Sequence, residues 1–181
     1  MTDVPLPANR DRVTNRALAI CKTIREDAKP EMIRYQKVRG LPQGECFYNV
    51  RNHLAKHGGE VVDGWAVWEH PPLLVQAEFH SAWLRPDGVL VDLTPPLHQG
   101  CWTTFLRAVD GEVYEGRNKN VVYLPYEESD LAIRFVELSK RWIELVYPEG
   151  EIQTSNFVVT PEIMAITREK GEILVQSQKR R

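Results

Sequence analysis

The sequence lacks any long apolar run. No stretch approaches the roughly 20 consecutive apolar residues that a membrane helix needs. The first residues, 1–11, also contain no apolar signal region. We therefore expect a chain that does not enter a membrane and stays in the cytoplasm.

Cysteine is also scarce. The chain has three cysteines, Cys21, Cys46 and Cys101, at wide spacing and without a Cys-x-x-Cys motif. An odd number at such spacing indicates neither a disulfide framework nor a structural zinc site. We expect free thiols and no metal or other cofactor.

An excess of charge of either sign is missing as well. The formal net charge is −2, from 23 basic and 25 acidic residues. Without a basic surplus there is no electrostatic reason to expect a phosphate backbone or an anionic membrane as partner. The charge balance argues against nucleic acid binding.

The length and the hydrophobic content allow one well-packed core. The chain has 181 residues, of which 43% are hydrophobic, and domains of about 150 residues bury roughly 70% of their unfolded surface. We predict a single domain over residues 1–181, with its central core at about 43–96. Regions 1–42 and 126–181 are expected to be helical, and residues 97–127 form either a substrate lid or an additional sheet edge.

Hydrophobic periodicity predicts an α+β fold. Helical patterns cover residues 12–26, a weaker stretch that ends near 38, 46–57, 131–145 after a cap at Ser129, and a last segment from Pro161. Strand patterns cover 60–69, 75–84, 88–93, 102–109 and 113–124, with Asp110-Gly111 as a hairpin signal between the last two. Short connections favour an antiparallel sheet, with the helix after Gly44 packed against it.

Cys46 occupies a position that suits a nucleophile. The turn-rich segment Gly40–Gly44 directly precedes it, and the helical pattern begins at Cys46 itself. A cysteine attacks as its thiolate, which the N-terminus of a helix and a neighbouring imidazolium both stabilise. Cys46 is therefore the candidate nucleophile.

His80 and Asp92 are predicted to lie on the same face of two neighbouring strands. The loop Arg85-Pro86-Asp87-Gly88 suits a type I turn followed by a left-handed glycine, which pairs Arg85 with Val89. This register sets His80 opposite Thr94 and makes Asp92 its diagonal neighbour, roughly 7 Å away. His80 is then the general base and acid, and Asp92 orients its ring.

The order of these motifs resembles the transglutaminase-like branch of the papain-like cysteine enzymes. The motifs, all within about residues 43–96, are Gly44-Glu45-Cys46, Gly58-Gly59 with Gly64-Trp65, His80-Ser81-Ala82-Trp83 and Asp92-Leu93-Thr94-Pro95. The family often has a tryptophan two residues after the histidine, whereas Trp83 is three residues after His80. This departure affects the pocket walls more than the triad.

The resemblance implies a papain-like core and a thiol that forms an acyl-enzyme with loss of ammonia or an amine. We expect a hydrolase or acyl transferase of the peptidase, isopeptidase or deamidase type, acting on a peptide or protein amide. The backbone N–H of Cys46 and the side-chain amide of Gln43 are the candidate donors to the oxyanion.

Two other readings of the same residues stay open. The domain is either a binding module that keeps the papain-like fold without catalysis, or a zinc protein whose ligands come from Cys46, His80, Asp92 and other histidines. Close ligand spacing, as zinc sites favour, is confined to His98-Gln99-Gly100-Cys101. Metal analysis separates the zinc reading from the thiol reading.

Overall fold

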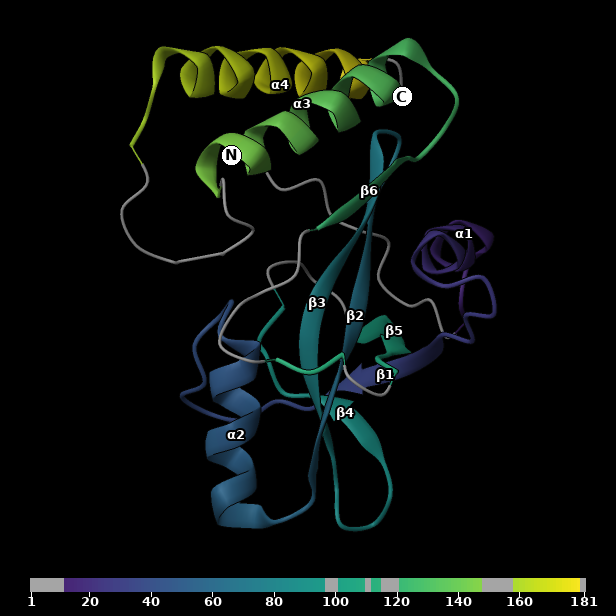
Figure 1. Cartoon of the computed structure of the whole chain (residues 1–181), viewed down its shortest axis with the longest axis vertical. Helices are drawn as coiled ribbons and strands as arrows, with labels where there is room; N and C mark the ends of the chain where they lie inside the picture. The colour runs from purple at the N-terminus through teal and green to yellow at the C-terminus, as the bar shows by residue number, and fades with distance from the viewer. Residues whose placement is uncertain (1–11, 97–100, 110–111, 115–120, 148–157, 180–181) are drawn as a thin grey trace.

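The computed structural model describes residues 12–96, 101–109, 112–114, 121–147 and 158–179. Within these residues the chain forms four helices and a sheet of six strands (Figure 1). The helices are α1 (Asn15–Ile24), α2 (Cys46–His57), α3 (Asp130–Val146) and α4 (Pro161–Lys179). The strands are β1 (Glu31–Tyr35), β2 (Glu60–His70), β3 (Leu74–Leu84), β4 (Leu90–Asp92), β5 (Trp102–Arg107) and β6 (Val122–Pro125). The α+β class is as predicted.

The sheet closes on itself into a small barrel. Its strand order is β2-β5-β1-β4-β3-β6, and β2 also pairs with β3, so β6 extends the sheet outside the closed part. Strands β2 and β3 pair antiparallel along their whole length and form the long hairpin at the centre of Figure 1. Strand β1 pairs parallel with β4. The prediction of a purely antiparallel sheet is therefore wrong at this pairing.

Capping residues account for the start of three helices. The hydroxyl of Ser129 accepts a hydrogen bond from the Ala132 N–H, as expected for the cap of α3, and Thr14 does the same for α1 through the Ala17 N–H. Pro161 is the first residue of α4, where its fixed φ is compatible with the helix and its missing N–H costs nothing. These local signals explain why the helix boundaries agree with the sequence pattern.

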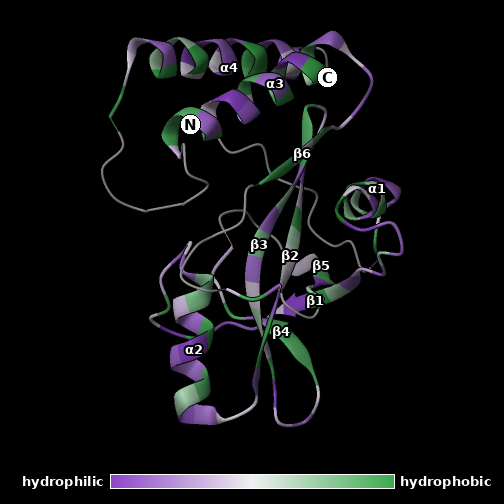
Figure 2. Cartoon of the chain, viewed as in Figure 1, coloured by the Kyte–Doolittle hydropathy of each residue, from purple (hydrophilic) through white to green (hydrophobic). Residues whose placement is uncertain are grey.

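The two faces of β3 pack against different elements. Its outer face contacts α1 through Phe79 and its neighbours and contacts α2 through Trp83, while its inner face enters the barrel interior at Ala82. Helices α3 and α4 lie together over the far end of the hairpin, against Leu74 of β3 and Tyr123 of β6. Hydrophobic and hydrophilic residues alternate along α4 (Figure 2), as expected for a helix with one packed face.

The described residues correct the sequence predictions for two segments. The weak helical stretch that was expected to end near residue 38 contains strand β1, so the region 1–42 is not wholly helical. Strand β1 lies between β4 and β5, and long-range pairing overrides a weak local helical pattern. The described strands β5 and β6 do not pair with each other, so they do not form the predicted hairpin; its turn residues, Asp110 and Gly111, lie outside the described part.

The segment 97–127 contributes strands rather than a separate lid in its described part. Strand β5 is an interior strand between β1 and β2, and β6 is an edge strand along β3. The edge-strand prediction is therefore correct for β6. Among the described helices, none has the length and apolar content that crossing a membrane requires.

Candidate active site

Cys46 is the first residue of α2. Gly44 has a φ of +74°, a left-handed conformation that glycine adopts without strain, and this turn directs the chain into the helix. The Asn49 N–H donates to the Glu45 carbonyl at 2.8 Å and closes the first turn. Because first-turn N–H groups have no acceptor within the helix, they present positive partial charge beside the Cys46 sulfur. The predicted position of Cys46 at the start of a helix is confirmed.

The turn between β3 and β4 sets the register on which the site depends. The Arg85 N–H donates to the Val89 carbonyl at 3.0 Å, and the Gly88 N–H donates to the Arg85 carbonyl at 2.9 Å, with Gly88 at a φ of +84°. Leu84 then pairs with Leu90, the register that the sequence predicted. A two-residue turn would have shifted β4 by one residue and turned its side chains to the other face.

His80 and Asp92 meet as this register requires. The His80 Nε2 lies 3.1 Å from the Asp92 Oδ1, and the same oxygen accepts the Thr94 N–H at 2.8 Å. Only 7% of His80 and 2% of Asp92 is exposed, so both bonds are shielded from water. With Nε2 engaged by the carboxylate, Nδ1 is the ring nitrogen left for the nucleophile.

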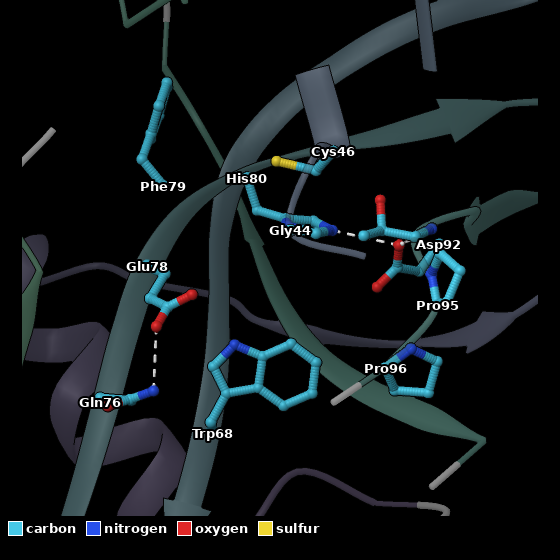
Figure 3. Close-up of a pocket in the computed structure, with 11 residues that line it drawn as sticks. Gly44, Cys46, Trp68, Gln76, Glu78, Phe79, His80, Asp92, Pro95 and Pro96 are labelled. Atoms are coloured by element: carbon cyan, nitrogen blue, oxygen red, sulfur yellow. Dashed lines mark hydrogen bonds and ion pairs between the residues drawn. The ribbon is translucent and has the colours of Figure 1, made fainter. Parts of the chain in front are cut away.

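The electrostatics favour a charged imidazole. Burial lowers the pKa of His80, but attraction to Asp92 and Cys46, together with hydrogen bonds to both, outweighs burial and holds that pKa well above its usual 6.5. Figure 3 shows the Cys46 sulfur beside His80 and the Asp92 carboxylate on the other side of the ring. The arrangement suits an imidazolium between the Cys46 sulfur and the Asp92 carboxylate.

The three groups share one pocket. A cavity of about 110 Å³ opens beside them. Its lining residues are Gly44, Cys46, Trp68, Gln76, Glu78, Phe79, His80, Asp92, Thr94, Pro95 and Pro96. The structure therefore brings together Cys46, His80 and Asp92, from α2, β3 and β4, at one cavity.

Gln43 does not line this pocket. It is exposed, and its side-chain amide donates to the Pro96 carbonyl at 3.2 Å. This bond joins the loop before α2 to the segment after β4. It uses one of the two N–H groups of the Gln43 amide. The role of Gln43 as an oxyanion donor stays a prediction.

Asn49 is a site residue that the sequence reasoning missed. It is completely buried one turn after Cys46, and its amide donates to the Pro42 carbonyl at 2.9 Å and to the Thr94 hydroxyl at 3.3 Å. These bonds hold the loop before α2 and the end of β4 against the same helical turn. Its spacing of three residues from Cys46 was the available signal, because such residues share a helix face.

Glu78 and Gln76 were missed as well. They precede His80 by two and four residues on β3, and side chains at that spacing point to the same face of a strand. The Gln76 amide donates to the Glu78 carboxylate at 2.9 Å. The two-residue spacing that places Gln76 and Glu78 on the same face as His80 is visible in the sequence.

The tryptophans of the hairpin have separate roles. Trp65 packs edge-on to Phe79 in the core, and the Trp83 indole donates to the Gly58 carbonyl at 2.9 Å. Of the three tryptophans, Trp68 is the one that lies at the pocket.

The remaining cysteines lie apart from the pocket. Cys21 is fully buried in the core under α1, where burial raises its pKa to about 11, and Cys101 is exposed. Within the described residues, no three His, Cys, Asp or Glu side chains are arranged to hold a metal ion. His98, part of the zinc alternative, lies outside those residues.

Comparison with known proteins identifies no relative of this chain, because no family model, no curated protein and no solved structure matches it.

Proposed function

We propose that the chain is a thiol-dependent amide hydrolase of the transglutaminase-like or papain-like type, with Cys46 as nucleophile, His80 as general acid and base, and Asp92 as the group that orients His80. The observation that carries the proposal is the short contact between His80 Nε2 and Asp92 Oδ1 in a pocket that Cys46 also lines. A carboxylate on one ring nitrogen fixes the tautomer and leaves the other nitrogen for proton transfer with the thiol.

Acylation follows from this arrangement. The Cys46 thiolate attacks the amide carbonyl carbon, a C–S bond forms, and the carbonyl oxygen takes the electron pair. When this intermediate collapses, the C–N bond breaks and His80 donates its proton to the departing nitrogen. The products of this half-reaction are a thioester on Cys46 and a free amine or ammonia.

Deacylation reverses the roles. His80, now neutral, accepts a proton from water, and the hydroxide that forms attacks the thioester carbon. The C–S bond then breaks, which releases a carboxylic acid and regenerates the thiolate. Water is the simplest acceptor, because hydrolysis needs no second substrate pocket.

The first turn of α2 supports the oxyanion step. The backbone N–H of Cys46 lies at the positive end of the helix dipole, beside the carbon that the sulfur attacks. A second donor is required for a complete oxyanion hole, and the Gln43 amide, which has one N–H beyond the bond to Pro96, is our candidate.

The compartment and the substrate class are part of the proposal. Cys21, Cys46 and Cys101 are free thiols, and a thiolate enzyme without disulfides fits the reducing cytoplasm. The substrate is an amide of a peptide or protein. No cofactor takes part in the mechanism.

The test is turnover of a panel of peptide amides in water enriched in ¹⁸O. Hydrolysis through Cys46 places one ¹⁸O in the released acid, and rapid quenching followed by mass spectrometry finds the acyl group on the peptide that contains Cys46. The variant Cys46→Ser should lose turnover and keep its fold, and Asp92→Ala should lower the rate by about 10²–10⁴. Turnover that survives in Cys46→Ser would contradict the proposal.

The same experiment separates the alternatives. A binding module with this fold would give no acyl adduct with any amide or thioester in the panel. Stoichiometric zinc bound through Cys46 in protein purified without added metal would remove the thiolate mechanism. An Asp92→Ala variant that unfolds would assign a structural role to that carboxylate.

A further inference from the structure

A chain of hydrogen bonds runs from helix α2 to the imidazole of His80. The Asn49 side-chain amide donates to the Thr94 hydroxyl at 3.3 Å, and the Thr94 N–H donates to the Asp92 Oδ1 at 2.8 Å. The same carboxylate oxygen lies 3.1 Å from the His80 Nε2. Asn49 is therefore linked to His80 through Thr94 and Asp92.

Helix α2 carries both ends of this chain of contacts. Cys46 and Asn49 are three residues apart on the helix, a spacing that places side chains on the same face. The Cys46 sulfur lies beside the His80 ring (Figure 3), and a hydrogen bond between the two side chains favours the charged ring. The contacts thus form a closed circuit that leaves α2 at Cys46, crosses two strands and returns to α2 at Asn49. A shift of the end of β4 relative to α2 has to break one of these bonds.

The orientation of the Asn49 amide is fixed by its surroundings. The side chain is completely buried, and its nitrogen also donates to the Pro42 carbonyl at 2.9 Å. Because a carbonyl group only accepts, the nitrogen of the amide rather than its oxygen must face Pro42. Water does not compete for these bonds, and a hydrogen bond in a buried environment is stronger than the same bond in water.

An amide at position 49 is costly for the core. Among the described residues, the Asn49 Oδ1 atom has no hydrogen-bond partner, and an unpaired buried carbonyl lowers stability. A leucine has a similar volume and no polar atom to satisfy. Stability alone therefore does not explain the amide, and such departures from good core packing are expected at functional sites. The amide adds two N–H bonds, one to the loop before Cys46 and one to the segment after Asp92.

We propose that Asn49 is a positioning residue of the thiol mechanism, and that its bond to Thr94 fixes the end of β4 on the helix that bears the nucleophile. Asp92 then holds the His80 ring in line with the Cys46 sulfur. This inference rests on the proposed function, and Asn49 itself does not line the pocket. When the bond is lost, the carboxylate is held less firmly against Nε2, and the attraction that favours a charged ring and a thiolate weakens.

The ionisable groups around His80 stay the same when this bond is removed. Cys46 faces the ring from α2 and Asp92 from β4, and Glu78 lines the same pocket two residues earlier on β3. On β1, Tyr35 pairs with Asp92, and burial, followed by the charge of Asp92, raises the pKa of Tyr35. On β2 the residue opposite the ring is a glycine. A change in the titration of the site therefore reports the orientation of these groups, not their number.

The test is the pH profile of Cys46 alkylation in Thr94→Val. Valine keeps the shape of the side chain and the backbone N–H that bonds to Asp92, but it has no acceptor for the Asn49 amide. Iodoacetamide alkylates a thiolate by forming a C–S bond with release of iodide, and peptide mapping gives the rates at Cys46 and Cys101 in the same molecule.

The expected change has the size of one hydrogen bond. At about pH 6 the ratio of the Cys46 rate to the Cys101 rate should fall about threefold to tenfold in Thr94→Val, and the midpoint of the Cys46 profile should rise by about 0.5–1 pH unit. Thr94→Ser keeps the hydroxyl acceptor and should recover most of the ratio that Thr94→Val loses.

Thr104→Val is the matched control for stability. Thr104 is buried like Thr94, its hydroxyl donates to the Met32 sulfur at 3.3 Å, and it does not line the pocket. Thr104→Val should lower the free energy of unfolding but keep the wild-type ratio and midpoint. A purely structural Thr94 would behave in the same way.

Asn49→Leu tests the amide directly, because it removes both N–H bonds and the unpaired oxygen together. The ratio should fall at least as far as in Thr94→Val. Because Asn49 acts through Thr94, the double variant should label Cys46 at the rate of Asn49→Leu alone. Losses that multiply in the double variant would show independent roles and contradict the proposal.

The outcomes separate this inference from the proposed function. A wild-type Cys46 that reacts no faster than Cys101 would overturn both. A wild-type advantage of Cys46 that Thr94→Val leaves unchanged in ratio and midpoint would overturn the positioning role and leave the thiol mechanism standing.

The wild type also provides a test that needs no variant. The Asn49 side-chain N–H protons should exchange slowly with water in NMR spectra, because they are buried and bonded, and they should shift at the pH where His80 titrates. Rapid exchange, or shifts that do not follow the titration of His80, would overturn the positioning role as well.

Discussion

The His80 ring meets the Asp92 carboxylate at 3.1 Å across a hairpin whose loop contains three residues, Pro86, Asp87 and Gly88. Their strands pair in the register that this loop sets, and the two residues are diagonal neighbours on one face. Because side chains alternate between faces, a loop one residue shorter would place His80 and Asp92 on opposite faces. A turn at the surface thus determines the geometry of a buried site.

The first prediction concerns Gly88. Gly88→Ala should lower the free energy of unfolding by about 1 kcal/mol, because Gly88 has a φ of +84°, where an alanine is strained although the space around it is open. The measurement is urea denaturation of the wild type and the variant.

Gly171 is the matched control for Gly88. It lies within α4 with open space around it, so Gly171→Ala should instead stabilise the protein by about 0.5–1 kcal/mol. Equal effects of the two alanines would contradict the assignment of strain to the β3–β4 turn.

The second prediction concerns the charge of His80. In the wild type the ring should stay protonated well above pH 6.5, because the favourable interactions with Asp92 and Cys46 outweigh the cost of burial. Asp92→Asn removes a negative charge and should move the pKa of His80 downward. The measurement is an NMR titration of the histidine ring protons.

His53 provides an internal reference in the same spectra. Burial and the positive charges of His57 and Lys56 lower its pKa, and Asp92→Asn should not change that value. An unchanged titration of His80 in the variant would contradict the proposed role of the carboxylate.

The charge of His80 also predicts how stability depends on pH. A group whose pKa is higher in the folded chain stabilises the fold fully below its unfolded pKa, about 6.5, and this contribution is lost as the pH rises through the folded pKa. The stability difference between wild type and Asp92→Asn should therefore be largest below about pH 6.5 and shrink at higher pH. Denaturant titrations across this range measure it, and a difference that grows with pH would contradict the account.

The third prediction concerns Asp63, which joins β2 to the elements around the site. Its nearly buried carboxylate accepts hydrogen bonds from the Ser81 hydroxyl and the Tyr114 N–H and lies 3.6 Å from the Arg51 guanidinium. Asp63→Ala leaves these donors without their acceptor and should lower the free energy of unfolding by about 2–4 kcal/mol. Thermal and urea denaturation measure the loss.

Asp27 is the control for Asp63. Its carboxylate forms an ion pair with Arg25 at 3.2 Å but is 83% exposed, and such pairs contribute at most about 1 kcal/mol. A loss in Asp63→Ala no greater than in Asp27→Ala would show that the Asp63 network does not stabilise the fold.

Local sequence signals predicted the parts of the structure that local chemistry determines. The Pro-Asp-Gly loop specified the register of His80 and Asp92, Ser129 specified the start of α3, and the turn at Gly44 specified the start of α2. Each of these features depends on backbone conformations and hydrogen bonds within a few residues. These local signals therefore specified the helix start at Cys46 and the shared face of His80 and Asp92.

Features that depend on distant pairing were not predicted. Strand β1 pairs in parallel with β4 and antiparallel with β5, and nothing within Glu31–Tyr35 specifies either partner. The hairpin signal at Asp110-Gly111 competed with pairing of β5 to β1 and β2, and the long-range partners determined the result. Barrel closure is a property of the whole sheet, so a pass along the chain does not find it.

The three cysteines provide internal controls for the central claim, because they differ in environment. Cys46 is only 6% exposed but lies beside His80, Cys101 is exposed, and Cys21 is fully buried with its pKa raised to about 11. An exposed thiol and the thiol beside His80 therefore compete within one molecule.

The most direct measurement is a short pulse of iodoacetamide at about pH 6, where an unperturbed thiol with a pKa near 8.5 is almost fully protonated, followed by peptide mapping. The account predicts that Cys46 is labelled first, that Cys101 follows slowly, that Cys21 stays unmodified, and that His80→Ala removes the advantage of Cys46. Labelling of Cys101 before Cys46, or a Cys46 rate that His80→Ala leaves unchanged, would contradict it.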